Sequence, residues 1–181
     1  MTHLTVRAAA PADAAALGAI HVASWRESYV GLLPRAMLAA LSIDARTAMW
    51  RRLLADPAAF GDAAVRVAVC GGELAGFGAC AAQRDPALAA AGFEGEVTAL
   101  YVRHAHQRLG LGRALMHALA RALEARGHGA ASLWVLRDNA PARAFYERLG
   151  GETLGEKVDD RPEARLVETA YGWRDLAMLM R

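Results

Sequence analysis

Two glycines one residue apart stand between an apolar run and an amphipathic stretch, and their spacing is suited to binding phosphate. Segment 107–113 reads Gln-Arg-Leu-Gly-Leu-Gly-Arg and follows the apolar segment 100–102. Glycine lets backbone amides approach a ligand closely, and a helix start adds unpaired N–H groups and a positive dipole end. We therefore expect a pyrophosphate-binding loop with Arg108 and Arg113 adding charge. The alternative is a strand-to-helix connection that needs glycine only for its turn.

Two better-known phosphate loops do not fit this segment. A P-loop requires Gly-x4-Gly-Lys-Ser/Thr, and the sequence has no such string. The dinucleotide fingerprint requires a third glycine where Leu115 stands and a tight turn directly after the strand. Several residues separate Val102 from Gly110, so this second pattern is excluded as well.

A second pair of polar residues with useful spacing lies downstream. Asn139 and Tyr146 are seven residues apart, which is about two turns of a helix, so the two side chains share one face. Asn139 also precedes Ala140 and Pro141, where it would serve as a helix N-cap. The alternative for Tyr146 is a core aromatic with a hydrogen-bonded hydroxyl.

Both segments resemble the GNAT superfamily of N-acetyltransferases. Segment 107–112 resembles the family's Gln/Arg-x-x-Gly-x-Gly/Ala signature, and segment 133–150 resembles the following strand and helix, ending in Phe-Tyr-x-x-x-Gly. The resemblance extends over Glu96 to Gly151, about a third of the chain. The sequence departs from the pattern where Gly151 follows Gly150, because the family often has an aromatic residue there.

The resemblance implies acetyl-coenzyme A as cosubstrate, a primary amine of a small molecule or peptide as acceptor, and no metal. His104 and His106 have no third ligand to complete a metal site. The residues expected to bind the cofactor are Leu100, Tyr101, Val102, Gln107, Arg108, Leu109, Gly110, Leu111, Gly112, Arg113, Asn139 and Tyr146. Trp25, Glu27 and Tyr29 are expected to wall the acceptor pocket, with packing against the sheet as the alternative for the aromatic pair.

Direct attack by an amine requires a base and an acid. An alkylamine has a reference pKa of about 10.4, so removing its proton at pH 7 costs about 4–5 kcal/mol. Glu96 is the candidate base, directly or through water, and a solvated strand-edge carboxylate is its alternative. Tyr146 is the candidate acid for the leaving thiolate, because its reference pKa of about 10 is close to that of a thiol. A strand amide near Tyr101 is expected to meet the oxyanion.

Two other functions are compatible with the same loop. The chain would be a catalytically silent module that binds acyl-coenzyme A as a sensor if no acceptor were turned over. It would be a transferase for longer acyl chains if a succinyl donor competed with the acetyl donor.

The elements that position these residues follow from hydrophobic periodicity and turn residues. They are, in chain order, a strand at 4–7, a helix opened by 11–13, a helix over 34–55, a hairpin of strands 65–70 and 74–82, a strand at 96–102, a helix over 111–126, a strand at 131–136, a helix over 140–149, and final strands at 153–158 and 166–176. This order predicts one α+β domain over residues 1–181. Its expected fold is the GNAT fold, a mixed, largely antiparallel sheet flanked by helices.

Composition limits the other classes. The chain has 181 residues, 55% hydrophobic and 22% charged, with a net charge of +2. So small a charge does not favour nucleic acid or an anionic membrane as partner, and no segment has the roughly 18 apolar residues of a transmembrane helix. Cys70 and Cys80 are expected to be buried free thiols in a cytoplasmic protein. Segment 171–176 is expected to line the acceptor pocket or to form a homodimer contact.

Overall fold

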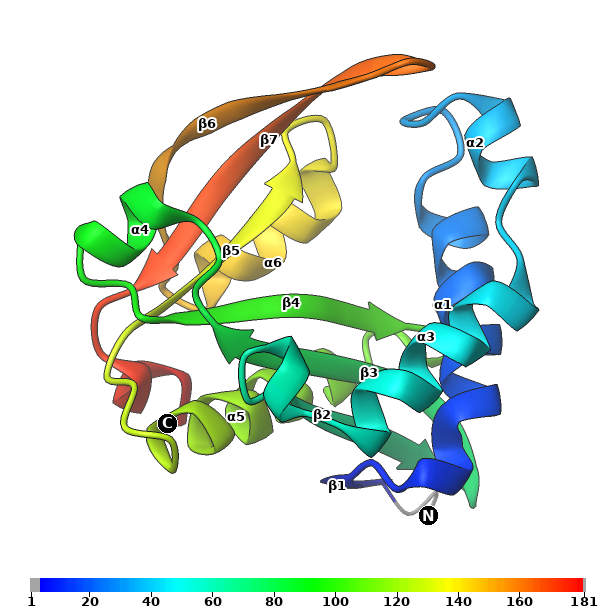
Figure 1. The fold of residues 1–181 in the computed structure, drawn as a ribbon, viewed down its shortest axis with the longest axis horizontal. Helices are drawn as coiled ribbons and strands as arrows, with labels where there is room; N and C mark the ends of the chain where they lie inside the picture. Colours follow the sequence, from blue (N-terminus) through cyan, green and yellow to red (C-terminus); the bar gives the residue numbers. More distant parts are fainter. Residues whose placement is uncertain (1–3, 181) are drawn as a thin grey trace.

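The computed structural model describes residues 4–180, which form a seven-stranded sheet with helices on both faces (Figure 1). The strands are β1 (Leu4–Ala8), β2 (Ala64–Cys70), β3 (Glu73–Ala82), β4 (Gly95–Val102), β5 (Ala131–Leu136), β6 (Glu152–Arg161) and β7 (Ala164–Trp173). The α-helices are α1 (Ala14–Ser28), α2 (Arg35–Ala39), α3 (Ile43–Ala55), α4 (Pro86–Ala90), α5 (Leu111–Glu124) and α6 (Ala140–Arg148). The predicted α+β architecture is confirmed.

The sheet has the order β1-β2-β3-β4-β5-β7-β6, and only the β4–β5 pair is parallel. A parallel connection needs a long crossover, and α5 provides it between these two strands. The other neighbours are antiparallel, and two of these pairs, β2–β3 and β6–β7, are hairpins. The mixed, largely antiparallel sheet that the sequence predicts is therefore present.

The parallel pair is short, and the two strands part almost at once. Gly95 pairs with Ala131 and Glu96 with Ser132, and no register partner follows. The register between β3 and β4 shifts at Ala79 and Cys80, which leaves Thr98 as an extra residue in β4. The bulge bends β4, so that β4 and β5 diverge as a fork (Figure 1). Beyond Glu96 the β5-facing edge of β4 keeps unpaired backbone amides.

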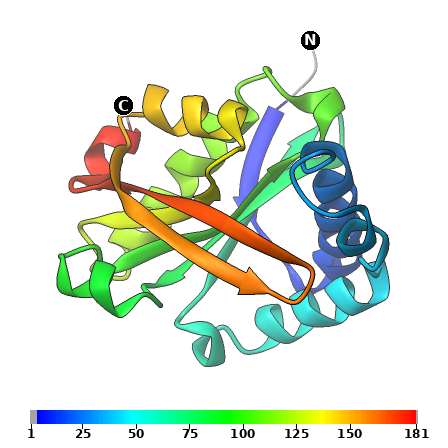
Figure 2. The ribbon, with the colours of Figure 1, turned by 90° about the horizontal axis from the view of Figure 1, so that it is seen from above.

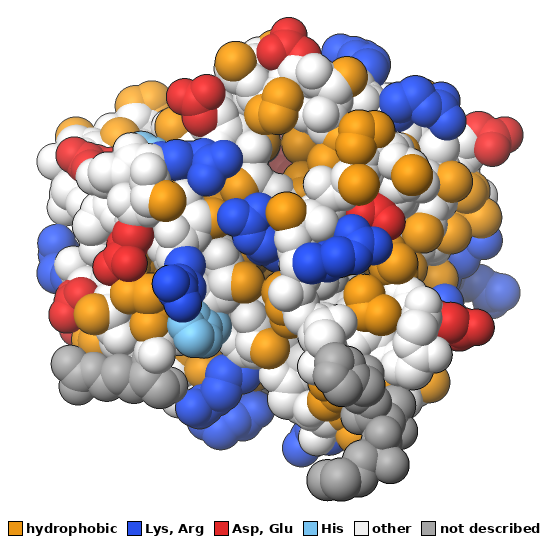
Figure 3. Space-filling view, turned by 90° about the horizontal axis from the view of Figure 1, so that it is seen from below, with side chains coloured by type: hydrophobic (Ala, Val, Ile, Leu, Met, Phe, Trp, Pro, Cys, Tyr) orange, Lys and Arg blue, Asp and Glu red, His pale blue; other side chains and the backbone are white. Residues whose placement is uncertain are grey.

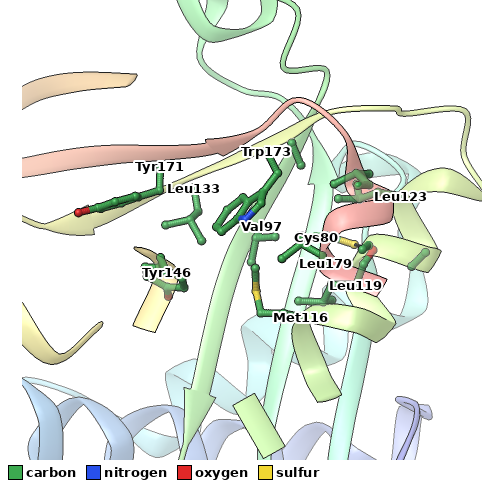
Figure 4. Close-up of a cluster of buried hydrophobic side chains, with 14 of the residues drawn as sticks. Cys80, Val97, Met116, Leu119, Leu123, Leu133, Tyr146, Tyr171, Trp173 and Leu179 are labelled. Carbon is green, nitrogen blue, oxygen red and sulfur yellow. Dashed lines mark hydrogen bonds between the residues drawn. The ribbon is translucent and has the colours of Figure 1, made fainter. Parts of the chain in front are cut away.

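Helix α5 packs firmly on one face of the sheet. Four leucines at intervals of four residues are at most 2% exposed: Leu111, Leu115, Leu119 and Leu123. Burying one leucine contributes roughly 2 kcal/mol, so this stripe fixes the helix and, with it, the loop before its first turn. Figure 4 shows Leu119 and Leu123 beside Val97 of β4 and Trp173 of β7 in one cluster.

The opposite face is covered by α1 and α3. Leu17 of α1 and Trp50 of α3 belong to one buried cluster with Phe77 of β3, whose ring lies edge-on to Trp50 at 4.9 Å between centroids. Beyond the end of α1, the β6–β7 hairpin reaches across toward α1 and α2, as both ribbon views show (Figures 1 and 2). The fork between β4 and β5 therefore lies between α1 and α2 on one side and the β6–β7 hairpin on the other.

Several boundaries differ from the predicted ones. The single helix expected over 34–55 is α2 and α3, because Ser42 caps α3 by accepting a hydrogen bond from the Ala45 amide at 3.2 Å. Helix α4 was not predicted; Asp85 caps it and Pro86 begins it. Strand β7 ends at Trp173 rather than 176, and a 3-10 turn follows at Leu176–Met180.

Two glycines lie just beyond helix ends in the left-handed region: Gly127 after α5 and Gly150 after α6, with φ of 85° and 78°. Cys70 and Cys80 are free and buried. None of the helices in the described part of the chain is long and apolar enough to cross a membrane. Within residues 4–180, His, Cys, Asp and Glu do not gather in threes in any arrangement that would hold a metal ion.

Candidate functional site

The fork opens into a cavity of about 1230 Å³, which is large for a single small-molecule site. Fourteen of the residues that the sequence singled out line it: Trp25, Glu27, Tyr29, Glu96, Leu100, Tyr101, Val102, Gln107, Arg108, Gly110, Gly112, Arg113, Asn139 and Tyr146. Segments far apart in the sequence therefore converge on one cavity. Two residues predicted to bind the cofactor are elsewhere: Leu111 is buried in the core, and Leu109 is 49% exposed beside β1. Segment 171–176, expected to line the acceptor pocket or to form a dimer contact, is not part of the lining either.

The loop before α5 has the backbone geometry of an anion-binding site. Gly110 is the N-cap of α5 with φ of 85°, and Arg108 has φ of 63°. Left-handed residues alternating with right-handed ones turn successive N–H groups to one side, and the first N–H groups of the helix lack internal partners. The Gln107 side chain donates from Nε2 to the Val102 carbonyl at 3.2 Å and holds the loop against the end of β4.

The second glycine has an additional role that the sequence pattern did not reveal. A Cβ on Gly112 would lie 3.1 Å from Cζ of Phe145. Glycine at this position therefore lets α6 approach the first turn of α5. The two glycines therefore differ: Gly110 adopts a left-handed conformation at the start of α5, and Gly112 leaves room for the Phe145 ring.

Helix α6 has residues that are structural and also line the cavity. The Asn139 Oδ1 accepts a hydrogen bond from the Ala142 amide at 3.3 Å, so Asn139 caps the helix and also lines the cavity. Tyr146 is 8% exposed, packs near Tyr171 and Trp173 with ring centroids 6.1 and 6.2 Å away, and lines the same cavity. Burial, with a smaller effect of Tyr101, raises the pKa of the Tyr146 hydroxyl well above its usual value.

Glu96 is not the solvated strand-edge carboxylate offered as an alternative. It is 3% exposed, and Arg84 binds it through Nη2 to Oε1 at 2.6 Å and Nε to Oε2 at 2.9 Å. The Arg84 amide also donates to Oε2 at 3.2 Å. Sequence reasoning missed Arg84, since no spacing links the β3–α4 connection to the start of β4. Glu96 is thus an oriented, paired carboxylate at the point where the fork opens.

Glu27 joins the end of α1 to the loop after β4. Glu27 Oε1 contacts the Arg103 guanidinium, with Nη2 at 2.8 Å and Nε at 2.9 Å. Glu27 Oε2 accepts a hydrogen bond from the His104 backbone amide at 2.9 Å. Burial alone would raise the pKa of Glu27, but these hydrogen bonds outweigh it and hold the pKa below its usual value. A carboxylate with a lowered pKa is a poor base and a good structural anchor.

The wall formed by α1 is aromatic. Trp25 and Tyr29 meet edge to face with centroids 5.0 Å apart, and Tyr101 of β4 stacks on His21 of α1 at 5.0 Å. Burial raises the pKa of the Tyr29 and Tyr101 hydroxyls, and Tyr101, Tyr146 and Glu168 raise that of Tyr29 further. The predicted aromatic corner is therefore one wall of the cavity.

The opposite wall comes from β5 and the β6–β7 hairpin, and sequence reasoning gave its residues no role. Trp134, Lys157 and Glu168 line the cavity there. The Lys157 ammonium lies 4.1 Å from the Trp134 ring centroid and 3.4 Å from Glu168 Oε2. Strand alternation would have placed Trp134 and Leu136 on one face, but not the hairpin opposite them.

The surface charges agree with the small net charge. The face seen in Figure 3 has arginine side chains interspersed with acidic and apolar ones. Around the cavity, Arg84, Arg103 and Lys157 each pair with a carboxylate. Arg108 and Arg113, both exposed, lie at the glycine loop itself.

Comparison with known proteins gives a family. The pattern of the Acetyltransferase (GNAT) family matches residues 23–151. The chain is 30% identical over 177 residues to the uncharacterized N-acetyltransferase YuaI of Bacillus subtilis (strain 168), and the match covers 97% of this chain and 96% of YuaI.

Solved structures share the fold at lower identity. The PaiA N-acetyltransferase of Thermoplasma acidophilum, in complex with coenzyme A, has a TM-score of 0.68 at 18% identity, covering 92% of this chain and 98% of that one. The structure of yncA from Salmonella typhimurium with acetyl-CoA has a TM-score of 0.67 at 21% identity, covering 96% and 94%. Because the family pattern spans more than half of the sequence, the chain belongs to the GNAT family of acetyl-coenzyme A-dependent N-acetyltransferases.

Proposed function

We propose that the chain transfers an acetyl group from acetyl-coenzyme A to a primary amine of a small molecule or peptide by direct attack in a ternary complex. The observation that carries this proposal is the fork between β4 and β5. It places the glycine loop on one side of a single cavity and an aromatic, carboxylate-bearing wall on the other. A cosubstrate and an acceptor entering from the two sides would meet at the fork.

The residues present fit coenzyme A. The free edge of β4 at Leu100, Tyr101 and Val102 offers backbone groups to a peptide-like pantetheine arm. The N-terminal amides of α5 and the exposed Arg108 and Arg113 suit a pyrophosphate. When bound, the cosubstrate supplies a thioester, and the chain orients it. Alternate β4 amides beyond the bulge face the fork, where one near Tyr101 meets the oxyanion.

Glu96 is the proposed proton acceptor. An ionised carboxylate has about four lone-pair sites. Three of the Glu96 sites are filled by Arg84. The fourth site accepts a proton from the ammonium group of the acceptor, directly or through one water. Arg84 keeps this carboxylate fixed at the opening of the fork, which geometry-dependent proton transfer requires.

Tyr146 is the proposed hydrogen-bond donor to the leaving sulfur. Reference pKa values would make complete proton transfer to a thiolate inexpensive, but burial raises the pKa of this hydroxyl and widens the gap. A hydroxyl with a raised pKa remains a good donor in a dry site. Its role is therefore to stabilise the developing negative charge on sulfur, rather than to surrender its proton early.

Release of free thiol from acetyl-coenzyme A tests the proposal across a panel of amines: polyamines, amino acids, aminoglycosides and peptides with a free N-terminus. We expect at least one amine to be acetylated at a rate that saturates with both substrates. Replacing acetyl- by succinyl-coenzyme A should slow the reaction. Binding of coenzyme A without turnover of any amine class would contradict the proposal.

A further inference from the structure

The cavity holds an amine that belongs to the chain itself. Lys157 is the single lysine among the 181 residues, and it lines the cavity from the β6–β7 hairpin. Its ammonium lies over the Trp134 ring at 4.1 Å and beside Glu168 Oε2 at 3.4 Å. An aromatic face and a carboxylate together make a good binding site for an alkylammonium ion.

The strand register places this amine close to the opening of the fork. Ser132 of β5 pairs with Glu96, the last paired residue of β4, and Trp134 stands two residues further along β5. Two residues along a strand span roughly 7 Å, and alternation puts both side chains on the same face. Lys157 of β6 pairs with Glu168 of β7, and Glu168 in turn pairs with Leu136 of β5. The Lys157 side chain therefore extends from the level of Leu136 back along the sheet to lie over Trp134.

We propose that Lys157 is an acetylation site of the chain itself, modified within the same molecule that binds the cosubstrate. The inference rests on the proposed function, since it requires acetyl-coenzyme A in the cavity. The Lys157 ammonium loses one proton to a cavity carboxylate, for which Glu168 is the nearest. The free amine attacks the thioester carbonyl, the new N–C bond forms, and the C–S bond breaks.

The reaction balances without a further reagent. The ammonium and the thioester give an amide, coenzyme A thiol and one proton, which passes to solvent. Acetylation removes the charge from Lys157, so the ion pair with Glu168 and the cation–π contact with Trp134 are both lost. That releases an aromatic face and a carboxylate to the ammonium group of an external acceptor.

The test is mass spectrometry of the purified full-length chain incubated with acetyl-coenzyme A and no acceptor. We expect the mass of one acetyl group to appear on the peptide that contains Lys157, at a rate that does not depend on protein concentration. Lys157→Arg keeps a cation over Trp134 and should acquire no acetyl group at this position. Gly110→Asp, which impairs the glycine loop, should slow modification at least tenfold.

A second readout needs no transfer at all. A coenzyme A thioether that cannot donate its acyl group should shield Lys157 from acetylation by a small reagent, N-hydroxysuccinimidyl acetate, by severalfold. Unchanged labelling would show that Lys157 lies away from the acyl group, and would overturn the proposal. A rate proportional to protein concentration, or equal modification of Gly110→Asp, would overturn it also.

These outcomes separate the two proposals. If an external amine is acetylated while Lys157 stays unmodified, the self-acetylation proposal fails and the proposed function stands. If coenzyme A does not bind and no amine is acetylated, the proposed function fails, and the self-acetylation proposal fails with it.

Discussion

Arg84 and Glu96 form a bidentate ion pair at the point where β4 and β5 diverge, with N–O distances of 2.6 and 2.9 Å. The Arg84 side chain is 71% exposed and the Glu96 side chain only 4%, so an exposed guanidinium binds a buried carboxylate. These hydrogen bonds hold the carboxylate in one orientation at the cavity that it lines.

The first prediction concerns the base. Glu96→Gln should lower kcat/KM for a working acceptor, and the loss should shrink at high pH, where the free amine is already abundant. Measuring pH–rate profiles of both forms tests this. Glu27→Gln is the matched control, because Glu27 also accepts hydrogen bonds from an arginine and a backbone amide. It should raise the KM for acetyl-coenzyme A by loosening the loop and leave the profile unchanged.

The opposite pattern would reassign the base. If Glu27→Gln moves the basic limb of the profile and Glu96→Gln does not, the proton acceptor lies on α1. If neither variant moves it, a water chain held by backbone carbonyls is the better account.

The second prediction concerns the glycine loop. Gly110→Asp should abolish the rise in melting temperature that coenzyme A gives the native protein, because it sets a negative charge against the pyrophosphate. Gly110→Asn is the control of equal size. Aspartate and asparagine both tolerate the left-handed conformation that Gly110 has, with φ of 85°, so the two variants differ only in charge. Equal shifts in the two variants would mean that the phosphates bind elsewhere.

The fold was predictable where local pattern and long-range packing agree. The leucine stripe of α5 could be recognised because its burial follows the helical period, and the hairpin of β2 and β3 because Gly71 and Gly72 separate two apolar runs. The break between α2 and α3 was not predictable, since segment 34–55 has enough apolar residues for one helix. Only the N-cap residue Ser42 marks the start of a second helix.

The lining of the cavity was predictable at the glycine loop and at the α1 corner of Trp25, Glu27 and Tyr29. The glycine loop is contiguous in sequence, so its residues identify one another. The opposite wall is assembled from β5 and the β6–β7 hairpin, and no sequence spacing brings Trp134, Lys157 and Glu168 together. Arg84 is missing from the predicted site for the same reason.

The third prediction uses the close approach of α5 and α6. In Gly112→Ala, the contact of the new Cβ with the Phe145 ring should cost about 1–3 kcal/mol of the free energy of unfolding. Alanine is favoured over glycine within a helix by about 1 kcal/mol, so the net loss should be at most about 2 kcal/mol. Denaturant unfolding measures this loss. Adding Phe145→Leu should recover part of it, making the double variant more stable than the sum of the two single changes predicts. Strict additivity would show that the two side chains do not meet.

The fourth prediction is a dependence of stability on pH through His21. This residue is 6% exposed, its Nδ1 accepts a hydrogen bond from Trp50 at 3.2 Å, and burial, helped by Arg46, lowers its pKa from 6.5 to about 4. The unfolded chain therefore binds a proton at this residue more readily than the native one. Between pH 6.5 and about 4 stability should fall as pH falls, by up to about 3 kcal/mol from this residue.

Denaturant unfolding of the native protein and of His21→Gln across that range isolates the effect. The variant should be less stable at pH 7 and depend less on pH, so the difference between the two should narrow toward pH 4. Parallel curves would mean that His21 has the same proton affinity in both states.

The last prediction concerns Tyr146. Tyr146→Phe keeps the ring that packs near Tyr171 and Trp173 and removes only the hydroxyl. We expect kcat to fall about 10²-fold while the Kd for coenzyme A changes little, since in the proposed mechanism the hydroxyl acts on the leaving sulfur and the phosphates bind at the glycine loop. Donors with a better leaving thiol should lose less, because their thiolates need less stabilisation. Tyr29→Phe, which removes a buried hydroxyl from the acceptor wall, should change the KM for the amine rather than the dependence on the leaving group. Native turnover in Tyr146→Phe would leave Tyr146 with its packing role alone.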